Sequence, residues 1–226
     1  MFINFAGYNP CSLVDYPGKV AFVAFVCGCN LRCSYCHNFK QCVSIGDAKM
    51  LNYEEILDNY VHVIGNIDVF VISGGEPTIY ADLPECIYEI SKNYKVKLDT
   101  NGSHHGILEE CMGYLDYIAM DIKASLSKYN LVKGDGYIRD VVKSLNIIKD
   151  GQVDHEFRIT VVDPIIKEED LEGIGDLVEG GQKLYLQKVR LEKVLCPEFP
   201  MKVVENETLK YYQDVLNDYI PTYLRL

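Results

Sequence analysis

Short apolar runs alternate with amphipathic segments along most of this chain. The run VAFVAFVC at residues 20–27 has the length of a buried strand, and YEEILDNYVHVIG at residues 53–65 places its apolar residues at helical spacing. The same alternation recurs toward the end of the chain. We predict strands at residues 20–27, 68–73, 96–100, 117–122, 155–162 and 183–189, and helices at residues 53–65, 83–94, 105–114, 137–149, 168–179 and 205–219. The pattern thus predicts six strand–helix rounds.

Such alternation favours an α/β fold in which parallel strands are covered by outer helices. Eight rounds close a full TIM barrel, so six predict a partial (β/α)6 TIM-like barrel. We expect a single domain over residues 1–226, with a core at about residues 20–190 and a C-terminal extension over residues 191–226. Functional residues in such folds follow the carboxyl ends of the strands, so the segments just after each predicted strand are the candidates.

The amino-acid composition limits the classes of binding partner and the cellular compartment that we expect. The chain has 33 acidic against 22 basic residues, and this net charge of −11 repels nucleic acids and anionic membrane surfaces. The N-terminal residues show no signal-peptide pattern, and no apolar run is long enough to span a membrane. We therefore expect a cytoplasmic protein with no nucleic-acid or membrane partner. Its nine cysteines are expected as reduced thiols, which favours metal binding over disulfides.

Three cysteines gather directly after the first predicted strand. In CNLRCSYCHN they are Cys29, Cys33 and Cys36, and three thiolates on a four-iron cluster would leave one iron open for chemistry. A structural zinc with His37 or Cys42 as fourth ligand is the alternative, and uncoordinated thiols are another. A histidine adjacent to Cys36 seldom reaches the same tetrahedral ion, and the chain lacks a second Cys-x-x-Cys pair. The motif therefore favours an iron-sulfur cluster.

Polar residues also mark the next predicted strands. In chain order they are Gly74-Gly75-Glu76-Pro77 after the second strand, Asp99-Thr100-Asn101-Gly102 after the third, Asp121 and Lys123 after the fourth, and Arg158 within the fifth. Glycines let backbone carbonyls approach an ammonium group closely, and a carboxylate adds a charge-assisted bond. Taken one at a time, these motifs are equally consistent with tight turns, solvated strand ends or, for Arg158, a structural salt bridge.

The cysteine spacing, with the aromatic Tyr35 before the last cysteine, resembles the radical S-adenosylmethionine (radical SAM) superfamily. The resemblance implies a 4Fe-4S cluster on the three cysteines and S-adenosylmethionine on the fourth iron. It also implies a Gly-Gly-Glu-Pro motif for the cofactor's amino group, acidic and basic strand ends for its methionine end and a monovalent cation, and an arginine near its carboxylate. The cofactor-binding residues so implied are Tyr35, Gly74, Gly75, Glu76, Asp99, Asp121, Lys123 and Arg158, and the metal-binding and catalytic residues are Cys29, Cys33 and Cys36.

Further segments narrow the resemblance to one type of activating enzyme. The leader SLVDYPGK, with GGEPT, KLDTNGS, DYIAMDIKAS and EFRITVV, is similar to activating proteins of anaerobic ribonucleoside-triphosphate reductase over about residues 7–190. The resemblance implies that the adenosyl radical removes a hydrogen atom from a glycine of that reductase, with flavodoxin or ferredoxin as electron donor. Cys27 departs from the family pattern, in which a polar amide is common at this position.

Other functions remain open on the sequence. The chain could activate another glycyl radical enzyme of the pyruvate formate-lyase type, or resemble 7-carboxy-7-deazaguanine synthase. From a different class, it could be an iron-sulfur electron carrier or a zinc-stabilised interaction module.

Overall fold

The computed structural model describes residues 3–42, 50–62 and 67–226. Contacts between residues divide the chain into two compact units. The first unit comprises Met1–Asn30, Asn38–Thr100 and His104–Ile118, and the second comprises Leu31–His37, Asn101–Ser103 and Ala119–Leu226. Strand β5 (Tyr117–Asp121) begins in the first unit and ends in the second.

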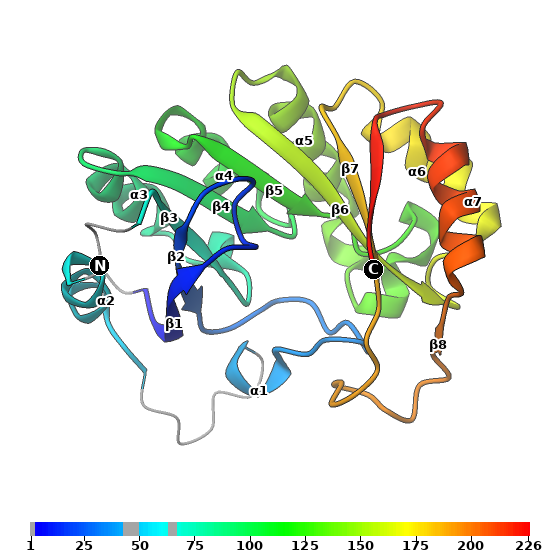
Figure 1. The fold of residues 1–226 in the computed structure, drawn as a ribbon, viewed down its shortest axis with the longest axis horizontal. Coiled ribbons are helices and arrows are strands. Elements are labelled where there is room, and N and C mark those ends of the chain that lie inside the picture. The colour runs from blue at the N-terminus through cyan, green and yellow to red at the C-terminus, as the bar shows by residue number, and fades with distance from the viewer. Residues whose placement is uncertain (1–2, 43–49, 63–66) are drawn as a thin grey trace. The chain divides into compact units, whose positions relative to one another are not determined.

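The first unit contains four strands and helices that follow them in the chain (Figure 1). The strands are β1 (Phe5–Ser12), β2 (Ala21–Val26), β3 (Val69–Gly74) and β4 (Lys95–Thr100), hydrogen-bonded in that order. The helices are α1 (Phe39–Cys42), α2 (Tyr53–Val61), α3 (Leu83–Ser91) and α4 (His105–Cys111), with the short 3-10 helices η2 (Pro77–Ile79) and η3 (Met112–Tyr114). Strand β1 is antiparallel to β2, whereas β2, β3 and β4 run parallel.

Apolar packing explains why the runs of this unit become strands. Residues Ala21 to Ala24 of β2 are inaccessible to solvent, and so is Val71 of β3. Phe22 packs on Tyr60 of α2 and on Phe70 of β3, with ring centroids 5.2 Å apart in both pairs. A strand buried on both faces has no polar alternation, which is the pattern that the sequence shows.

The second unit holds the remaining strands. They are β6 (Asp154–Asp163), β7 (Leu184–Lys188) and β9 (Thr222–Arg225), parallel and adjacent in that order, and β8 (Lys202–Val203), antiparallel to β6. Its helices are α5 (Ile138–Asp150), α6 (Leu171–Val178) and α7 (Asn206–Leu216), with the 3-10 helices η4 (Leu126–Val132), η5 (Asp135–Tyr137) and η6 (Glu168–Asp170). Figure 1 shows β9, in red, beside β7.

The predicted rounds are confirmed, with additions. The six predicted strands correspond to β2 through β7, and the six predicted helices to α2 through α7. Strands β1, β8 and β9 were not predicted, and the end of the predicted helix at residues 63–65 lies outside the described residues. The single domain over residues 1–226 stays a prediction. Within the described ranges, no helix combines the length and the apolar character that crossing a membrane requires.

Candidate functional site

The cysteine motif leaves the end of β2. Cys29 belongs to the first unit, and Cys33 and Cys36 belong to the second. Cys33 is buried, whereas Cys29 and Cys36 are partly accessible, and none of the three is in a disulfide. In the described part of the chain, no group of three or more His, Cys, Asp or Glu side chains is arranged so that it could hold a metal ion. The side chain of Cys42, the alternative zinc ligand, lies outside that part. As a donor set, three thiols suit iron in a sulfide cluster.

Two segments of the second unit hold the loop that carries Cys33 and Cys36. The Arg32 amide donates to the Val132 carbonyl at 2.9 Å, at the end of η4. From the C-terminal segment, the Cys196 amide donates to the Ser34 carbonyl at 3.0 Å, and the Ser34 hydroxyl donates to the Met201 sulfur at 3.3 Å. The conformation of this loop therefore depends on segments that are remote in the sequence.

Tyr35, predicted to touch the cofactor, is buried in the second unit. Its hydroxyl donates to the Lys123 carbonyl at 3.3 Å. Burial raises the pKa of Tyr35 well above its usual value, and the nearby Cys33 adds a smaller contribution in the same direction. The phenol stays neutral, and the hydrogen bond ties the cysteine loop to the end of β5.

The Gly-Gly-Glu loop of the first unit is built on close backbone contact with β2. Gly74 has φ +113°, and a Cβ atom there would lie 2.6 Å from the Val26 nitrogen, so only glycine fits. The Gly75 amide donates to the Val26 carbonyl at 3.1 Å, and the Glu76 amide donates to the Gly28 carbonyl at 2.9 Å. This loop is therefore hydrogen-bonded to the segment that leads directly into Cys29.

Glu76 is completely buried and cross-links two strand ends. Its Oε1 accepts hydrogen bonds from the Thr78 amide at 3.0 Å, the Thr78 hydroxyl at 2.6 Å and the Thr100 hydroxyl at 2.6 Å. The first bond caps η2, and the last reaches the end of β4. The carboxylate thus has a structural role in this unit, which the sequence motif alone did not indicate.

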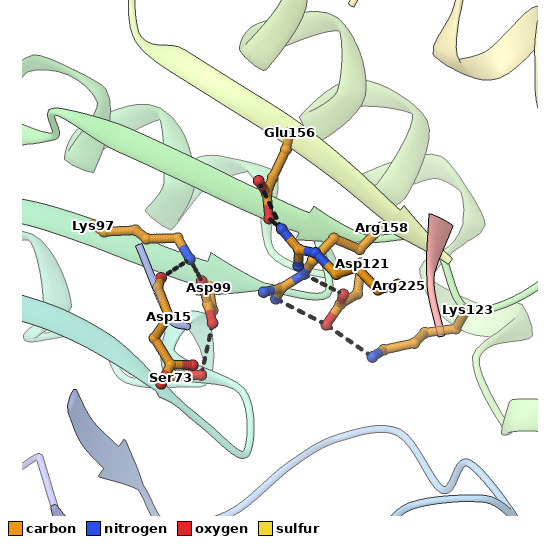
Figure 2. Close-up of polar contacts among 9 residues, drawn as sticks. All are labelled: Asp15, Ser73, Lys97, Asp99, Asp121, Lys123, Glu156, Arg158 and Arg225. Carbon is orange, nitrogen blue, oxygen red and sulfur yellow. Dashed lines mark hydrogen bonds and ion pairs between the residues drawn. The ribbon is translucent and has the colours of Figure 1, made fainter. Parts of the chain in front are cut away.

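Asp99 lies in a buried polar cluster of the first unit (Figure 2). The Ser73 hydroxyl donates to its Oδ2 at 2.9 Å, and the Lys97 ammonium forms an ion pair with its Oδ1 at 3.0 Å. Sequence reasoning missed Lys97. Its signal was the alternation of Lys95, Lys97 and Asp99 with apolar residues along β4, which places all three side chains on one face of the strand.

Asp121, Lys123 and Arg158 meet in the second unit (Figure 2). Asp121 Oδ1 accepts from Arg158 Nε at 2.8 Å, and Asp121 Oδ2 accepts from Lys123 Nζ at 3.0 Å. Burial would raise the pKa of Asp121, but Arg158 and Lys123 outweigh it and hold that pKa well below its usual range. Burial would lower the pKa of Lys123, but Asp121 and then Cys33 hold it above its usual range. Two cations and one carboxylate leave this cluster with one positive charge.

A second arginine of this unit was also missed. Arg225 of β9 donates to Glu156 Oε1 at 3.0 Å and stacks 3.7 Å from the ring centroid of Tyr185. Glu156 is almost fully buried in β6, so it needs this partner. Figure 2 shows the pair, which joins β6 to the last strand.

The comparison with protein families gives one match over most of the chain. Residues 23–178 match the model of the Radical SAM superfamily. The chain belongs to this superfamily, whose enzymes use a 4Fe-4S cluster and S-adenosylmethionine. It is therefore a radical SAM enzyme, and not the electron carrier or the zinc-stabilised module that the sequence left open.

Curated relatives indicate which type of radical SAM enzyme this chain is. A protein of Methanocaldococcus jannaschii, provisionally named a glycyl-radical enzyme activating enzyme, is 33% identical over 203 residues, which cover 86% of this chain and 83% of that protein. The pyruvate formate-lyase-activating enzyme of Clostridium pasteurianum is 34% identical over 134 residues, which cover 55% of this chain and 51% of the enzyme. This chain thus spans about half the length of the second relative. Within the superfamily it is of the glycyl-radical-enzyme activating type.

A solved structure supports the fold. QueE from Escherichia coli aligns with a TM-score of 0.65 at 15% identity, covering 99% of this chain and 93% of that one. At this identity the likeness concerns the fold alone. The predicted α/β architecture, a partial TIM-like barrel as in radical SAM structures, is confirmed.

Proposed function

We propose that this chain activates anaerobic ribonucleoside-triphosphate reductase. When bound, the cluster would supply one electron that cleaves the sulfonium C–S bond of S-adenosylmethionine into methionine and a 5′-deoxyadenosyl radical, which takes a hydrogen atom from one glycine of the reductase. The products are 5′-deoxyadenosine and a glycyl radical. We propose flavodoxin or ferredoxin as the class of electron donor, and a cytoplasmic location stays a prediction.

One observation carries the proposal more than any other. The Gly-Gly-Glu loop, which the family resemblance assigns to the cofactor's amino group, donates hydrogen bonds to Val26 and Gly28, immediately before Cys29. The amino-group motif and the entry to the cysteine motif are therefore one local structure within the first unit. This arrangement supports a cofactor that touches both.

The charges of the second unit support the same proposal. The cluster of Asp121, Lys123 and Arg158 carries a net positive charge, because two cations face one ionised carboxylate. Arginine and lysine side chains held in this way suit the carboxylate of an amino-acid ligand. We propose that Lys123 and Arg158 provide this attraction and that Asp121 orients both.

The choice of the reductase rests on the leader SLVDYPGK and the strand-end segments that follow it. A second candidate target is an enzyme of the pyruvate formate-lyase type, which the name of the clostridial relative favours. The same chemistry on a glycine would serve either target, and an activation assay with both targets distinguishes them.

The test is an anaerobic activation assay. The protein is reconstituted with iron and sulfide, reduced with dithionite, and mixed with S-adenosylmethionine and either the host's anaerobic ribonucleotide reductase or a pyruvate formate-lyase. We expect a glycyl radical signal in electron paramagnetic resonance with the reductase. Cys36→Ala should abolish it, and Cys196→Ala serves as the matched control because it also removes a partly accessible thiol while keeping the amide that binds Ser34.

Each outcome has a definite meaning. A signal on pyruvate formate-lyase alone would reject the reductase and keep the activating type. Formation of 5′-deoxyadenosine with neither target radical would reject both partners. Full activity of the Cys36→Ala protein would refute the assignment of that cysteine as a cluster ligand.

A further inference from the structure

A lysine is buried in the polar cluster of the first unit. Lys97 lies in the middle of β4, and only 2% of its side chain is accessible. Lysine is almost never so buried unless it is paired. Its side chain shares a face of the strand with Asp99, two residues further on. The sequence thus places an ammonium group beside a carboxylate that the family resemblance assigns to the cofactor region.

The ammonium has partners from three segments. It lies 3.0 Å from Asp99 Oδ1, donates a hydrogen bond to the Asp15 carbonyl in the leader, and lies 5.7 Å from the ring centroid of Tyr117. A carboxylate, a carbonyl oxygen and an aromatic face are all groups that attract a cation. Figure 2 shows the lysine between Asp15 and Asp99.

The other oxygen of Asp99 is also engaged. Ser73 at the end of β3 donates to Oδ2 at 2.9 Å, so the carboxylate is fixed from two sides. Because the Lys97 ammonium balances the charge of Asp99, a further cation at Oδ1 would meet a like charge at close range. The contact between Lys97 and Oδ1 is an ion pair without the geometry of a hydrogen bond, so the ammonium occupies the place that a cation would take. A monovalent cation, which the family resemblance implies there, would have to displace the lysine.

We propose that Lys97 is a positioning residue whose ammonium replaces a bound monovalent cation at Asp99. The lysine neutralises the charge of the carboxylate and orients it, and it links the leader at Asp15 to the end of β4. The enzyme then binds S-adenosylmethionine without a requirement for potassium or sodium. This inference concerns the cofactor region and holds whichever glycyl radical enzyme is the target.

The first test uses the protein without cluster. Thermal unfolding is measured in potassium chloride and in choline chloride at equal ionic strength, for the wild type, Lys97→Met and Lys95→Met. Lys95 lies on the same strand but is exposed, so it is the matched control. We expect the midpoint of Lys97→Met to rise with potassium in a saturable way, because the cation then pairs with Asp99. The wild type and Lys95→Met should give the same midpoint in both salts.

The second test measures the affinity of the reconstituted enzyme for S-adenosylmethionine in the same salts. We expect less than a twofold change for the wild type, and at least a tenfold loss for Lys97→Met in choline that potassium or ammonium ions partly restore. A tenfold loss of wild-type affinity in choline would overturn the proposal. So would a Lys97→Met protein that loses affinity equally in every salt, since that pattern marks a purely structural lysine. If Lys97→Met does not fold, the wild-type comparison alone decides.

Discussion

Replacing Glu76 should destabilise the enzyme even when no cofactor is bound. The side chain is completely buried, and its Oε1 accepts three hydrogen bonds. Hydrogen bonds to charged groups contribute about 1.5–3 kcal/mol each, but the three share one oxygen and are not additive. The Thr78 hydroxyl also has a second neighbour, His104 Nδ1 at 3.5 Å, to which it can turn. We therefore expect Glu76→Ala to cost about 3–5 kcal/mol.

Thermal unfolding of the cluster-free protein measures this cost. For a chain of this size each kcal/mol shifts the midpoint by about 2–4 °C, so the expected fall is roughly 6–20 °C. Glu76→Gln keeps a carbonyl oxygen as acceptor and loses only the charge, so it should lose about 1–2 kcal/mol. The two variants together separate the missing acceptor from the missing charge.

The opposite result would be informative. If Glu76→Ala unfolds at the wild-type temperature without cofactor and loses only affinity for S-adenosylmethionine, then Glu76 is a cofactor ligand and its three internal bonds contribute little. That result would refute the role as a cross-link between η2 and the end of β4.

Two further predictions concern single strand ends. Gly74→Ala should destabilise the protein by about 2 kcal/mol or more in urea unfolding, because its Cβ would overlap the Val26 nitrogen at 2.6 Å. Gly106→Ala, in open space on α4, should be neutral or stabilising in the same measurement. Asp121→Asn should cost about 1–3 kcal/mol at pH 7, since it leaves Arg158 without its carboxylate. Because the pKa of Asp121 is lowered on folding, its contribution is present above its unfolded pKa of about 3.9 and disappears as the pH falls through the folded value. The stability gap between wild type and variant should therefore narrow in acid, and a gap that is constant from pH 7 to pH 3 would contradict the ion-pair explanation.

Hydrophobic runs were sufficient to predict most strands. Strands β2 and β3 are buried on both faces, so their continuous apolar sequence is a strong signal. Strand β1 was missed because FAGYNPCS contains Asn and Pro, and its pairing with β2 is interrupted by two irregularities. Proline is tolerated there because β1 lies at the end of the strand order and is an edge strand.

The sequence predicted which residues form the candidate site, but not which contacts these residues make. Strand-end spacing identified Asp99, Asp121 and Glu76 because functional residues of parallel sheets follow the carboxyl ends of the strands. It could not show that Glu76 bonds internally to two threonines, since these contacts depend on how the β3 and β4 ends approach each other. Lys97 was overlooked because a lysine in a strand is normally expected to be exposed to solvent. Its burial depends on partners such as Asp99, which only the tertiary structure reveals.

The bonds between Ser34 and the C-terminal segment have a consequence for biosynthesis. Ser34 and Met201 are 167 positions apart, and ribosomes add about 5–20 residues per second. A nascent chain therefore carries its cysteine loop for roughly ten to thirty seconds before the segment that anchors it has been made. During that interval the thiols of Cys33 and Cys36 lack these anchors and are open to oxidants and to stray metal ions. Cluster insertion into the finished loop must accordingly wait until the segment around Met201 has been made.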